Sequence, residues 1–364
     1  MHSIHLLKAL DNFKILINLG AMERINLFGN TVADLENVML EIGEKPYRAK
    51  QLFKWFYKLG EHEFKRMTDL SRDLRQLLTD KFSFIGMVPE KTLVSSDGSE
   101  KFLYRLTDDS LIESVLLKDG DKRTVCVSSQ VGCPLGCTFC ATGMMGFKRN
   151  LSTAEIVGQL VYLRRRDGDD AFGNIVFMGM GEPLLNFENL VRTVGIISSG
   201  IGLSISARKV TVSTVGIVPE IYRLADTKLK VNLAISLHAA NDDKRRKIIP
   251  VAKKYPLEKL TEAAKYFAHK RKNRITFEYV LIGDFNDGDE DIRELSRLVR
   301  GIPCKINILS YNPVEGLPYR RPTEDEINWF AQELYPHAPA VTVRKSRGLD
   351  ISGACGQLAG KYIN

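Results

Sequence analysis

Several features are scarce in this chain of 364 residues, and each absence excludes a class of protein. No apolar run approaches the roughly 18 residues that a membrane-spanning helix needs. Lys8, Asp11 and Lys14 interrupt the N-terminal stretch, so it lacks the apolar centre of a secretion signal. Six cysteines are too few for a disulfide scaffold. We therefore expect a protein of the cytoplasm that does not associate with membranes.

The remaining composition is ordinary for a globular protein. Hydrophobic residues make up 44% and charged residues 26%. At roughly 100–200 residues per domain, the length indicates two or three domains. Lys and Arg number 52 against 44 acidic residues, which gives a net charge of +8. This excess favours polyanionic partners, although a moderate excess also occurs in proteins that bind none.

Hydrophobic periodicity first indicates a small helical domain. Residues 1–21 show no clear period and read as an N-terminal extension. Residues 22–90 are helical in pattern, with Thr31 and Asp34 placed as a capping box and Ser71 as the cap of a later helix. We assign this second segment as a helical accessory domain.

The pattern then changes to strands. Residues 91–122 alternate with a period of two, and the Asp97-Gly98 pair is typical of a hairpin turn. This segment is predicted to be a short β-meander connector. Residues 123–350 form the main domain and 351–364 a C-terminal catalytic loop and tail.

The main domain alternates strands and helices. Strands are expected at 124–129, 175–178, 209–213, 231–237, 275–281 and 305–309, and helices at 153–166, 187–199, 256–270, 288–300 and 323–334. Units of this size predict parallel strands with right-handed crossovers. The expected fold class is α/β with a partial (β/α)6 barrel, and a doubly wound sheet is the alternative. In both, chemistry is expected at the carboxyl ends of the strands.

Three cysteines follow the first barrel strand, at Cys133, Cys137 and Cys140. A structural zinc site takes four ligands, usually in paired Cys-x-x-Cys arrangements, and this loop holds three cysteines and no histidine. A cubane iron–sulfur cluster normally takes four thiolates, so three leave one iron open to a small molecule. A zinc site completed from elsewhere and a buried structural trio are the alternatives.

This cysteine pattern, with Phe139 before the last cysteine, resembles the signature of the radical S-adenosylmethionine (SAM) superfamily. The resemblance implies a [4Fe-4S] cluster whose open iron binds the amino and carboxylate groups of SAM. It also implies an electron donor such as flavodoxin or ferredoxin, because one-electron reduction cleaves SAM to a 5′-deoxyadenosyl radical.

Candidate SAM contacts follow the predicted strands. Gly181 and Glu182 lie in a stretch that resembles the superfamily's Gly-Glu motif, which holds the amino group of SAM. A lone Ser, His or Asn at a strand end is more often structural, but several face the same mouth here. The further candidates are Ser213, Ser236, Leu237, His238 and Asn312.

Two more cysteines narrow the resemblance. Cys126 lies on the first barrel strand, and Cys355 lies in a glycine-rich loop near the C-terminus, whereas Cys304 reads as a core residue. Together with the motifs above, they resemble the radical SAM RNA methyltransferases that modify C2 of adenosine. The resemblance extends from about residue 24 to the C-terminus. It implies that the predicted partial barrel is a radical SAM barrel.

The family implies RNA substrates and a mechanism. Its targets are an adenosine of 23S rRNA in the peptidyl transferase centre and the adenosine 3′ of the anticodon in a subset of tRNAs. We expect the protein to be a monomer. By resemblance, Cys355 takes a methyl group from one SAM. A 5′-deoxyadenosyl radical from a second SAM then removes hydrogen from this S-methyl group, and the resulting carbon radical adds to C2. Cys126 then releases the product by forming a transient disulfide, and Glu113 accepts a proton. Without the motif, Glu113 reads as a solvated strand carboxylate.

Three other functions stay open at this point, and the third is a radical SAM enzyme with an unrelated substrate, for which Cys126 and Cys355 would be dispensable. A sister subgroup methylates adenine C8 and confers antibiotic resistance, and it shares the five proposed chemical cysteines. A non-catalytic, metal-containing RNA-binding protein is the second alternative.

Basic groups that could face RNA occur at 164–166, 244–247, 253–254, 270–274, 320–321 and 344–347. In the helical domain, Lys45, Arg48, Lys50, Lys54 and Lys58 interleave with Tyr47, Phe53 and Trp55.

Overall fold

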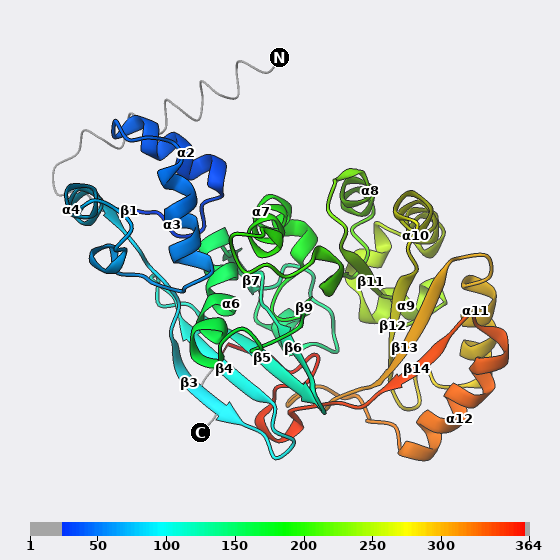
Figure 1. Cartoon of the computed structure of the whole chain (residues 1–364). Helices are drawn as coiled ribbons and strands as arrows, with labels where there is room; N and C mark the ends of the chain where they lie inside the picture. The colour runs from blue at the N-terminus through cyan, green and yellow to red at the C-terminus, as the bar shows by residue number, and fades with distance from the viewer. Residues whose placement is uncertain (1–23, 361–364) are drawn as a thin grey trace.

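The structure is a computed structural model that describes residues 24–360 (Figure 1). The N-terminal extension expected at 1–21 and the end of the C-terminal tail lie outside these residues. Within 24–360, no helix combines the length and the apolar character needed to cross a membrane.

A helical unit forms the N-terminal part (Figure 1). Its elements are β1 (Ile25–Asn26), α2 (Val32–Glu41), α3 (Arg48–Tyr57), α4 (Arg72–Lys81) and β2 (Phe82–Ser83). The predicted capping box forms, since the Thr31 side chain accepts from the Asp34 N–H and the Asp34 carboxylate accepts from the Thr31 N–H. Ser71 caps α4 as expected. Side chains of α3, including Phe53, form the centre of its core.

The main body is built on one ten-stranded sheet, with the order β14-β13-β12-β11-β10-β9-β6-β5-β4-β3. Its strands are β3 (Pro89–Val94), β4 (Glu100–Arg105), β5 (Leu111–Asp119), β6 (Lys122–Cys126), β9 (Asn174–Phe177), β10 (Val210–Thr214), β11 (Asn232–Ser236), β12 (Ile275–Leu281), β13 (Cys304–Ser310) and β14 (Val341–Arg344). From β6 to β14 neighbouring strands are parallel. The six predicted barrel strands are β6 and β9 to β13, so the α/β fold class with a partial barrel is confirmed.

The meander strands belong to this same sheet. β3, β4 and β5 are antiparallel, and β5 pairs with the first barrel strand, β6, with Val115 opposite Cys126. Alternating hydrophobicity identifies a strand but not its partner, which is why the sequence indicated only a connector. The meander therefore extends the barrel sheet and brings β5 next to the strand that carries Cys126.

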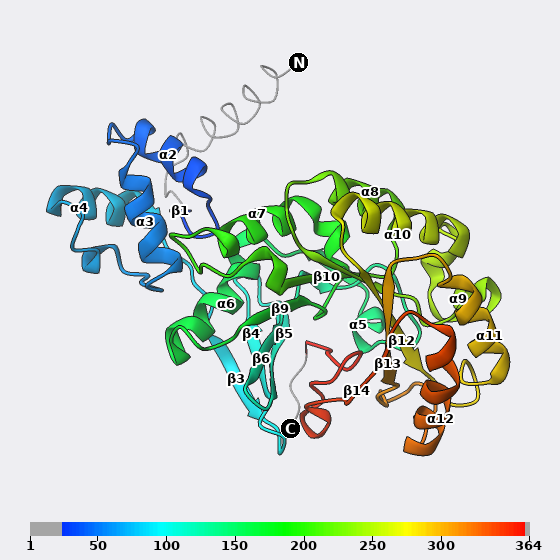
Figure 2. The same ribbon diagram turned by 45° about the vertical axis from the view of Figure 1, so that its right-hand side comes forward.

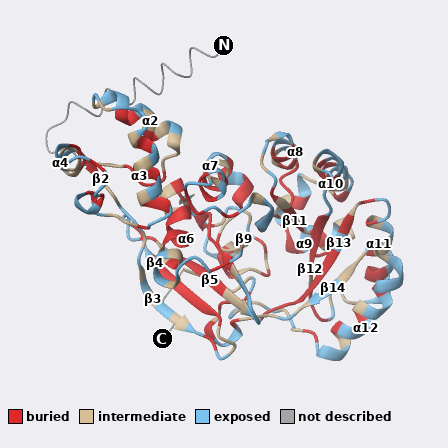
Figure 3. Ribbon diagram, in the orientation of Figure 1, coloured by how far each residue is buried: buried red, intermediate tan, exposed pale blue. Residues whose placement is uncertain are grey.

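Helices cover the outer face of the sheet (Figures 1 and 3). They are α6 (Thr153–Asp167), α7 (Phe187–Ser198), α8 (Val218–Asp226), α9 (Asp242–Ile248), α10 (Leu257–Arg271), α11 (Asp289–Leu298) and α12 (Glu324–Leu334). In Figure 3 the central strands are red along much of their length, while the helices turn exposed faces outward. The core thus lies between the sheet and this helical layer, and the concave side of the sheet is left for the site.

The C-terminal segment, residues 345–360, returns from β14 toward the meander (Figure 2). The Gly348 N–H donates to Oδ2 of Asp97 at 2.8 Å, and the Asp350 carboxylate accepts from Ser95 Oγ at 2.5 Å and from the Ser96 N–H at 2.9 Å. The hairpin turn between β3 and β4 therefore holds one end of the loop that carries Cys355.

Candidate functional site

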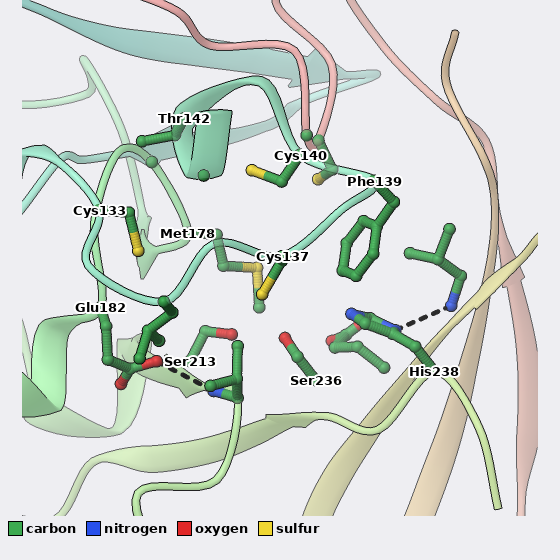
Figure 4. Close-up of a pocket in the computed structure, with 18 of the residues that line it drawn as sticks. Cys133, Cys137, Phe139, Cys140, Thr142, Met178, Glu182, Ser213, Ser236 and His238 are labelled. Carbon is green, nitrogen blue, oxygen red and sulfur yellow. Dashed lines mark hydrogen bonds between the residues drawn. The ribbon is translucent and has the colours of Figure 1, made fainter. Parts of the chain in front are cut away.

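A cavity opens at the carboxyl ends of the parallel strands (Figure 4). Most residues predicted for the cluster and for SAM line it, although they come from segments far apart in the chain. These are Cys133, Cys137, Cys140, Gly181, Glu182, Ser213, Ser236, His238 and Asn312, together with Cys355. We call this space the main cavity.

The cysteine loop is closed at its base by a small antiparallel sheet of β7 (Gln130–Gly132) and β8 (Phe147–Asn150). Gly132 has φ +71°, and a Cβ there would lie 1.9 Å from the carbonyl oxygen of Gly146. Only glycine permits this approach. The next N–H, of Cys133, then donates to that carbonyl at 2.8 Å. The loop between these strands presents its three thiols to the main cavity (Figure 4).

The protonation state of the three thiols depends on what the main cavity binds. Burial raises the pKa of Cys133 to about 12 and that of Cys137 well above its ordinary value, and the neighbouring thiols add to both shifts. A bound cationic iron would reverse this preference, because it stabilises the thiolates. Within residues 24–360, no group of three His, Cys, Asp or Glu side chains is arranged so that it could hold a single metal ion. A four-iron cluster has a different requirement, one thiolate for each iron.

Glu182 is a buried carboxyl on the wall of this cavity. Its Oε1 accepts from the Leu184 N–H at 3.1 Å and its Oε2 from the Val215 N–H at 3.0 Å. Burial raises its pKa to about 7. Gly181, with φ +98°, lies so close to Gln130 that an added Cβ would be 2.5 Å from the Gln130 Cβ. The turn thus fixes a carboxyl group that a cationic amine would stabilise in its charged form.

His238 enters the cavity as a neutral ring. Its Nδ1 accepts from the Val280 N–H at 3.0 Å, which leaves Nε2 as the protonated nitrogen. The ring packs edge-to-face on Phe139, with centroids 4.9 Å apart. Burial lowers the pKa of His238 to about 3, and the positive charge of Arg245 contributes. His238 can therefore donate a hydrogen bond across the physiological range of pH.

The other predicted SAM contacts differ in what they offer. Ser213 and Ser236 line the main cavity (Figure 4). The Leu237 side chain is packed in the core, so only its backbone is near the site. Asn312 is engaged within the protein: its Nδ2 donates to the Cys355 carbonyl at 3.1 Å, and its Oδ1 accepts from Ser346 Oγ at 2.7 Å.

Sequence reasoning missed Arg245, which is 1% exposed. Its guanidinium donates to the carbonyl oxygens of Leu237 at 3.1 Å, Val215 at 2.5 Å and Ser236 at 3.4 Å. It therefore ties together the chain segments at the ends of β10 and β11, which contribute Val215 and Ser236 to the lining of the main cavity. The signal was hidden because Arg245 lies in a run of charged residues, which ordinarily indicates a solvated face.

Cys126 and Cys355 meet at a second cavity, which adjoins the main one. Cys126 ends β6 and is buried, Cys355 is exposed, and both line this second cavity together with Arg344. Burial raises the pKa of the Cys126 thiol, and the positive charge of Arg344 opposes the shift. Since Cys355 lines both cavities, its thiol lies where the two spaces adjoin.

Glu113 is not a solvated strand carboxylate, because it is only 1% exposed. Its Oε1 lies 2.9 Å from Lys101 Nζ, and its Oε2 accepts from the N–H groups of Ala359 and Gly360 at 2.8 and 3.1 Å. Glu113 lines neither the main cavity nor the second cavity. It lines a third cavity, together with Ser352 and Ala359 of the C-terminal segment. The sequence could not indicate this burial, since the partners lie 12 and about 246 positions away.

Several basic groups expected to face RNA instead pair within the protein. Arg166 binds Glu100 and Lys244 binds Asp291, each at 2.7 Å. Arg320 likewise pairs with acidic neighbours. Tertiary folding brings together acidic partners that a local reading of charge runs cannot see.

The three aromatic residues that interleave with the basic groups of the helical unit differ in exposure. Tyr47 is 50% exposed, with the Arg48 guanidinium 4.9 Å from its ring centroid. Phe53 is a core residue, and the Trp55 Nε1–H donates to Asp69 at 2.6 Å. Of the three aromatics, Tyr47 is therefore the one best placed to stack on a base.

Comparison with known proteins covers nearly the whole chain. Residues 25–83 match the ribosomal RNA large subunit methyltransferase N-terminal domain, and residues 127–296 match the radical SAM superfamily. The dual-specificity RNA methyltransferase RlmN of Geobacter sulfurreducens is 45% identical over 337 residues, which cover 93% of this chain and 92% of the relative. This chain belongs to the RlmN family. The family member of Francisella tularensis subsp. novicida is 44% identical over 351 residues, covering 94% of both chains.

A solved structure agrees with this placement in the RlmN family. The radical SAM methyltransferase from Sphaerobacter thermophilus matches with a TM-score of 0.88 and 43% identity, over 93% of this chain and all of the other. The protein is therefore a radical SAM RNA methyltransferase. The first match, to residues 25–83, coincides with the helical unit of α2, α3 and α4.

Proposed function

We propose that this protein methylates C2 of adenosine in RNA, at one position of 23S rRNA in the peptidyl transferase centre and at the adenosine 3′ of the anticodon in a subset of tRNAs. One observation carries the proposal. Cys355 borders both the cavity that holds the three cluster cysteines and the cavity that holds Cys126. A thiol in that position can receive a methyl group on one side and be attacked by a second thiol on the other.

The main cavity suits the two cofactors of the superfamily. Cys133, Cys137 and Cys140 would hold a [4Fe-4S] cluster, while Glu182 would pair with the amino group of SAM and His238 would donate a hydrogen bond from Nε2. Ser213, Ser236 and the backbone beside Leu237 would complete the SAM site. When bound, the cluster supplies one-electron reduction, and SAM supplies both the methyl group and the radical.

The two thiols divide the transfer between them. Cys355 accepts the methyl group as a thiolate, and the positive charge of Arg344, which lines the same cavity, favours that thiolate. After the carbon has bonded to adenine C2, the radical adduct would give one electron back to the cluster and its C2 proton to Glu113, and the Cys126 thiolate would then attack the Cys355 sulfur. The sulfur–carbon bond would break with its electron pair left on the carbon, which takes up a proton to become the methyl group, and a disulfide would form between the two cysteines. Their shared cavity supports this pairing.

Glu113 is proposed as the base that takes a proton while the adduct breaks down. It lies on β5, next to the strand that carries Cys126. As its carboxylate accepts hydrogen bonds from Ala359 and Gly360, the C-terminal segment must move before that oxygen can reach RNA.

Anaerobic reconstitution tests the proposal. The purified chain is loaded with iron and sulfide, then mixed with SAM, a reductant such as reduced flavodoxin, and unmodified 23S rRNA or tRNA. Mass spectrometry of the digested RNA should show 2-methyladenosine, together with 5′-deoxyadenosine and S-adenosylhomocysteine. Appearance of 8-methyladenosine instead would move the protein to the C8-methylating subgroup. RNA binding without cleavage of SAM would indicate a non-catalytic protein.

Matched cysteine variants test the residue roles. Cys355→Ala should bind the cluster but not methylate itself, and continued RNA methylation by this variant would refute the relay. Cys304→Ala is the control, since Cys304 is buried at the start of β13, away from both thiol cavities. Its activity should stay within about two-fold of wild type.

A further inference from the structure

Lys101 is a buried lysine to which the mechanism above gives no role. It lies on β4, is 3% exposed, and its Nζ is 2.9 Å from Oε1 of Glu113 on β5. Both charged side chains are almost wholly buried, so each needs further hydrogen-bond partners to offset the hydration it has lost. Those partners show what the pair does.

Both members of the pair reach the segment that carries Cys355. Lys101 Nζ donates to the Ser352 carbonyl at 3.3 Å, three residues before the thiol. Oε2 of Glu113 accepts the N–H groups of Ala359 and Gly360 at 2.8 and 3.1 Å, on the other side of the thiol. One ion pair on the meander therefore holds the loop on both sides of its reactive residue.

We propose that Lys101 is a positioning residue for the thiol relay, which clamps the Cys355 loop through Glu113. The inference rests on the proposed function for its catalytic meaning, but the clamp itself does not depend on it. Charge-assisted hydrogen bonds are stronger and better directed than neutral ones. The clamp thus fixes the Cys355 thiol where the two cavities adjoin, within reach of a donor in one and of Cys126 in the other.

The clamp also links the loop to the proposed base. While Ala359 and Gly360 occupy Oε2 of Glu113, that oxygen accepts two N–H groups and Oε1 faces Lys101. Withdrawal of the loop end would free Oε2, while Oε1 would stay paired with Lys101. Cys355 would then accept its methyl group while the loop is held, and Glu113 would accept a proton only after the end of the loop has withdrawn.

Other contacts would keep the loop near its place when the clamp is removed. The Thr142 hydroxyl donates to the Leu358 carbonyl at 2.6 Å, and Gln357 Nε2 donates to the Pro313 carbonyl at 2.9 Å. Loss of the clamp should therefore loosen the loop without detaching it. Such a change is measurable by local hydrogen exchange.

The test compares Lys101→Met with Lys101→Arg and with the control Lys118→Met. Lys118 also lies on the meander, on β5, and its Nζ pairs with Glu100 at 2.8 Å rather than with Glu113. Amide exchange at 359–360 and the rate of Cys355 alkylation by iodoacetamide are measured by mass spectrometry on the full chain. Neither measurement requires RNA, SAM or the cluster, so failure of the proposed function would leave the test of the clamp intact.

Lys101→Met should raise exchange at Ala359 and Gly360 by about ten-fold or more, because Glu113, which accepts both N–H groups, loses the charge-assisted contact that holds it in place. Cys355 alkylation should accelerate, while the Lys118→Met values stay within about two-fold of wild type. In the reconstituted enzyme, kcat for RNA methylation should fall at least about ten-fold with little change in KM, and Lys101→Arg should restore part of it. A purely structural role predicts no such split.

The clamp is refuted if exchange at 359–360 in Lys101→Met equals that of Lys118→Met, or if exchange rises equally throughout the barrel. Lys101→Met leaves a buried carboxylate without its cation, so a double variant with Glu113→Gln provides a neutral version that can fold. That variant should also exchange faster at 359–360 than Lys118→Met. Equal exchange in the two would overturn the proposal.

Discussion

The depressed pKa of His238 predicts how the stability of the barrel depends on pH. Burial lowers this pKa from 6.5 to about 3, so the folded chain keeps the ring neutral where the unfolded chain protonates it. The unfolded state then binds more protons, and the free energy of unfolding falls as pH decreases below 6.5. The contribution is fully present above about pH 6.5 and is lost as pH falls toward 3.

The size of the effect follows from that difference. Each pH unit corresponds to about 1.36 kcal/mol, so His238 should cost about 2.7 kcal/mol of stability at pH 4.5 and about 4.4 kcal/mol at pH 3. His238→Gln removes the titration and keeps an acceptor for the Val280 N–H. The difference in unfolding free energy between wild type and variant should therefore change by about 2.7 kcal/mol between pH 7 and pH 4.5.

Urea unfolding of the cluster-free chain at several pH values measures this difference. The sequence has two tryptophans, so a Trp55→Phe background leaves Trp329 of α12 as the fluorescent probe of the barrel. His269→Gln, at an exposed position near the end of α10, is the matched control and should remain parallel to wild type. Parallel curves for wild type and His238→Gln would refute the reasoning, since a ring that titrates equally in both states contributes no slope.

Three further predictions follow from single contacts. Cys126→Ala should lower turnover by more than about 100-fold and accumulate a covalent protein–RNA species, visible as a shifted band on a denaturing gel. Arg245→Met should lower the free energy of unfolding by about 3 kcal/mol because buried carbonyls lose their donor, whereas Arg246→Met, at a more exposed position, should change it by less than about 0.5 kcal/mol in the same urea assay. Gly181→Ala should cost about 1–3 kcal/mol in that assay, because its Cβ would overlap Gln130, and a SAM affinity equal to that of wild type by calorimetry would contradict this placement.

Local signals predicted the elements and the cluster loop well. The capping box of Thr31 and Asp34 forms because its hydrogen bonds join residues three apart, and the six barrel strands were found because their hydrophobic runs are short and bounded by turns. Cys133, Cys137 and Cys140 lie within one loop, so their spacing alone indicated that they face a common space. Each of these inferences depends on contacts within a few residues of sequence.

Contacts between distant segments could not be predicted in the same way. Arg245 was assigned to a basic surface because its neighbours in sequence are charged, yet its partners are carbonyl oxygens of two other loops. Glu113 read as a solvated residue because strand alternation does not show that Lys101 and Gly360 cover it. In both cases burial is set by partners that hydrophobic patterning does not register, since the paired groups are themselves polar.

The position of the meander in the sheet explains how the proposed base and the proposed thiols come together. Val115 lies opposite Cys126 across the antiparallel pair of β5 and β6, so Glu113, two residues away, shares a face of the sheet with both. A slip of one residue in this pairing would turn Glu113 to the opposite face and also remove Lys101 from the C-terminal segment. The register of β5 against β6 is therefore a requirement of the proposed chemistry, and the meander is as much a part of the site as the barrel.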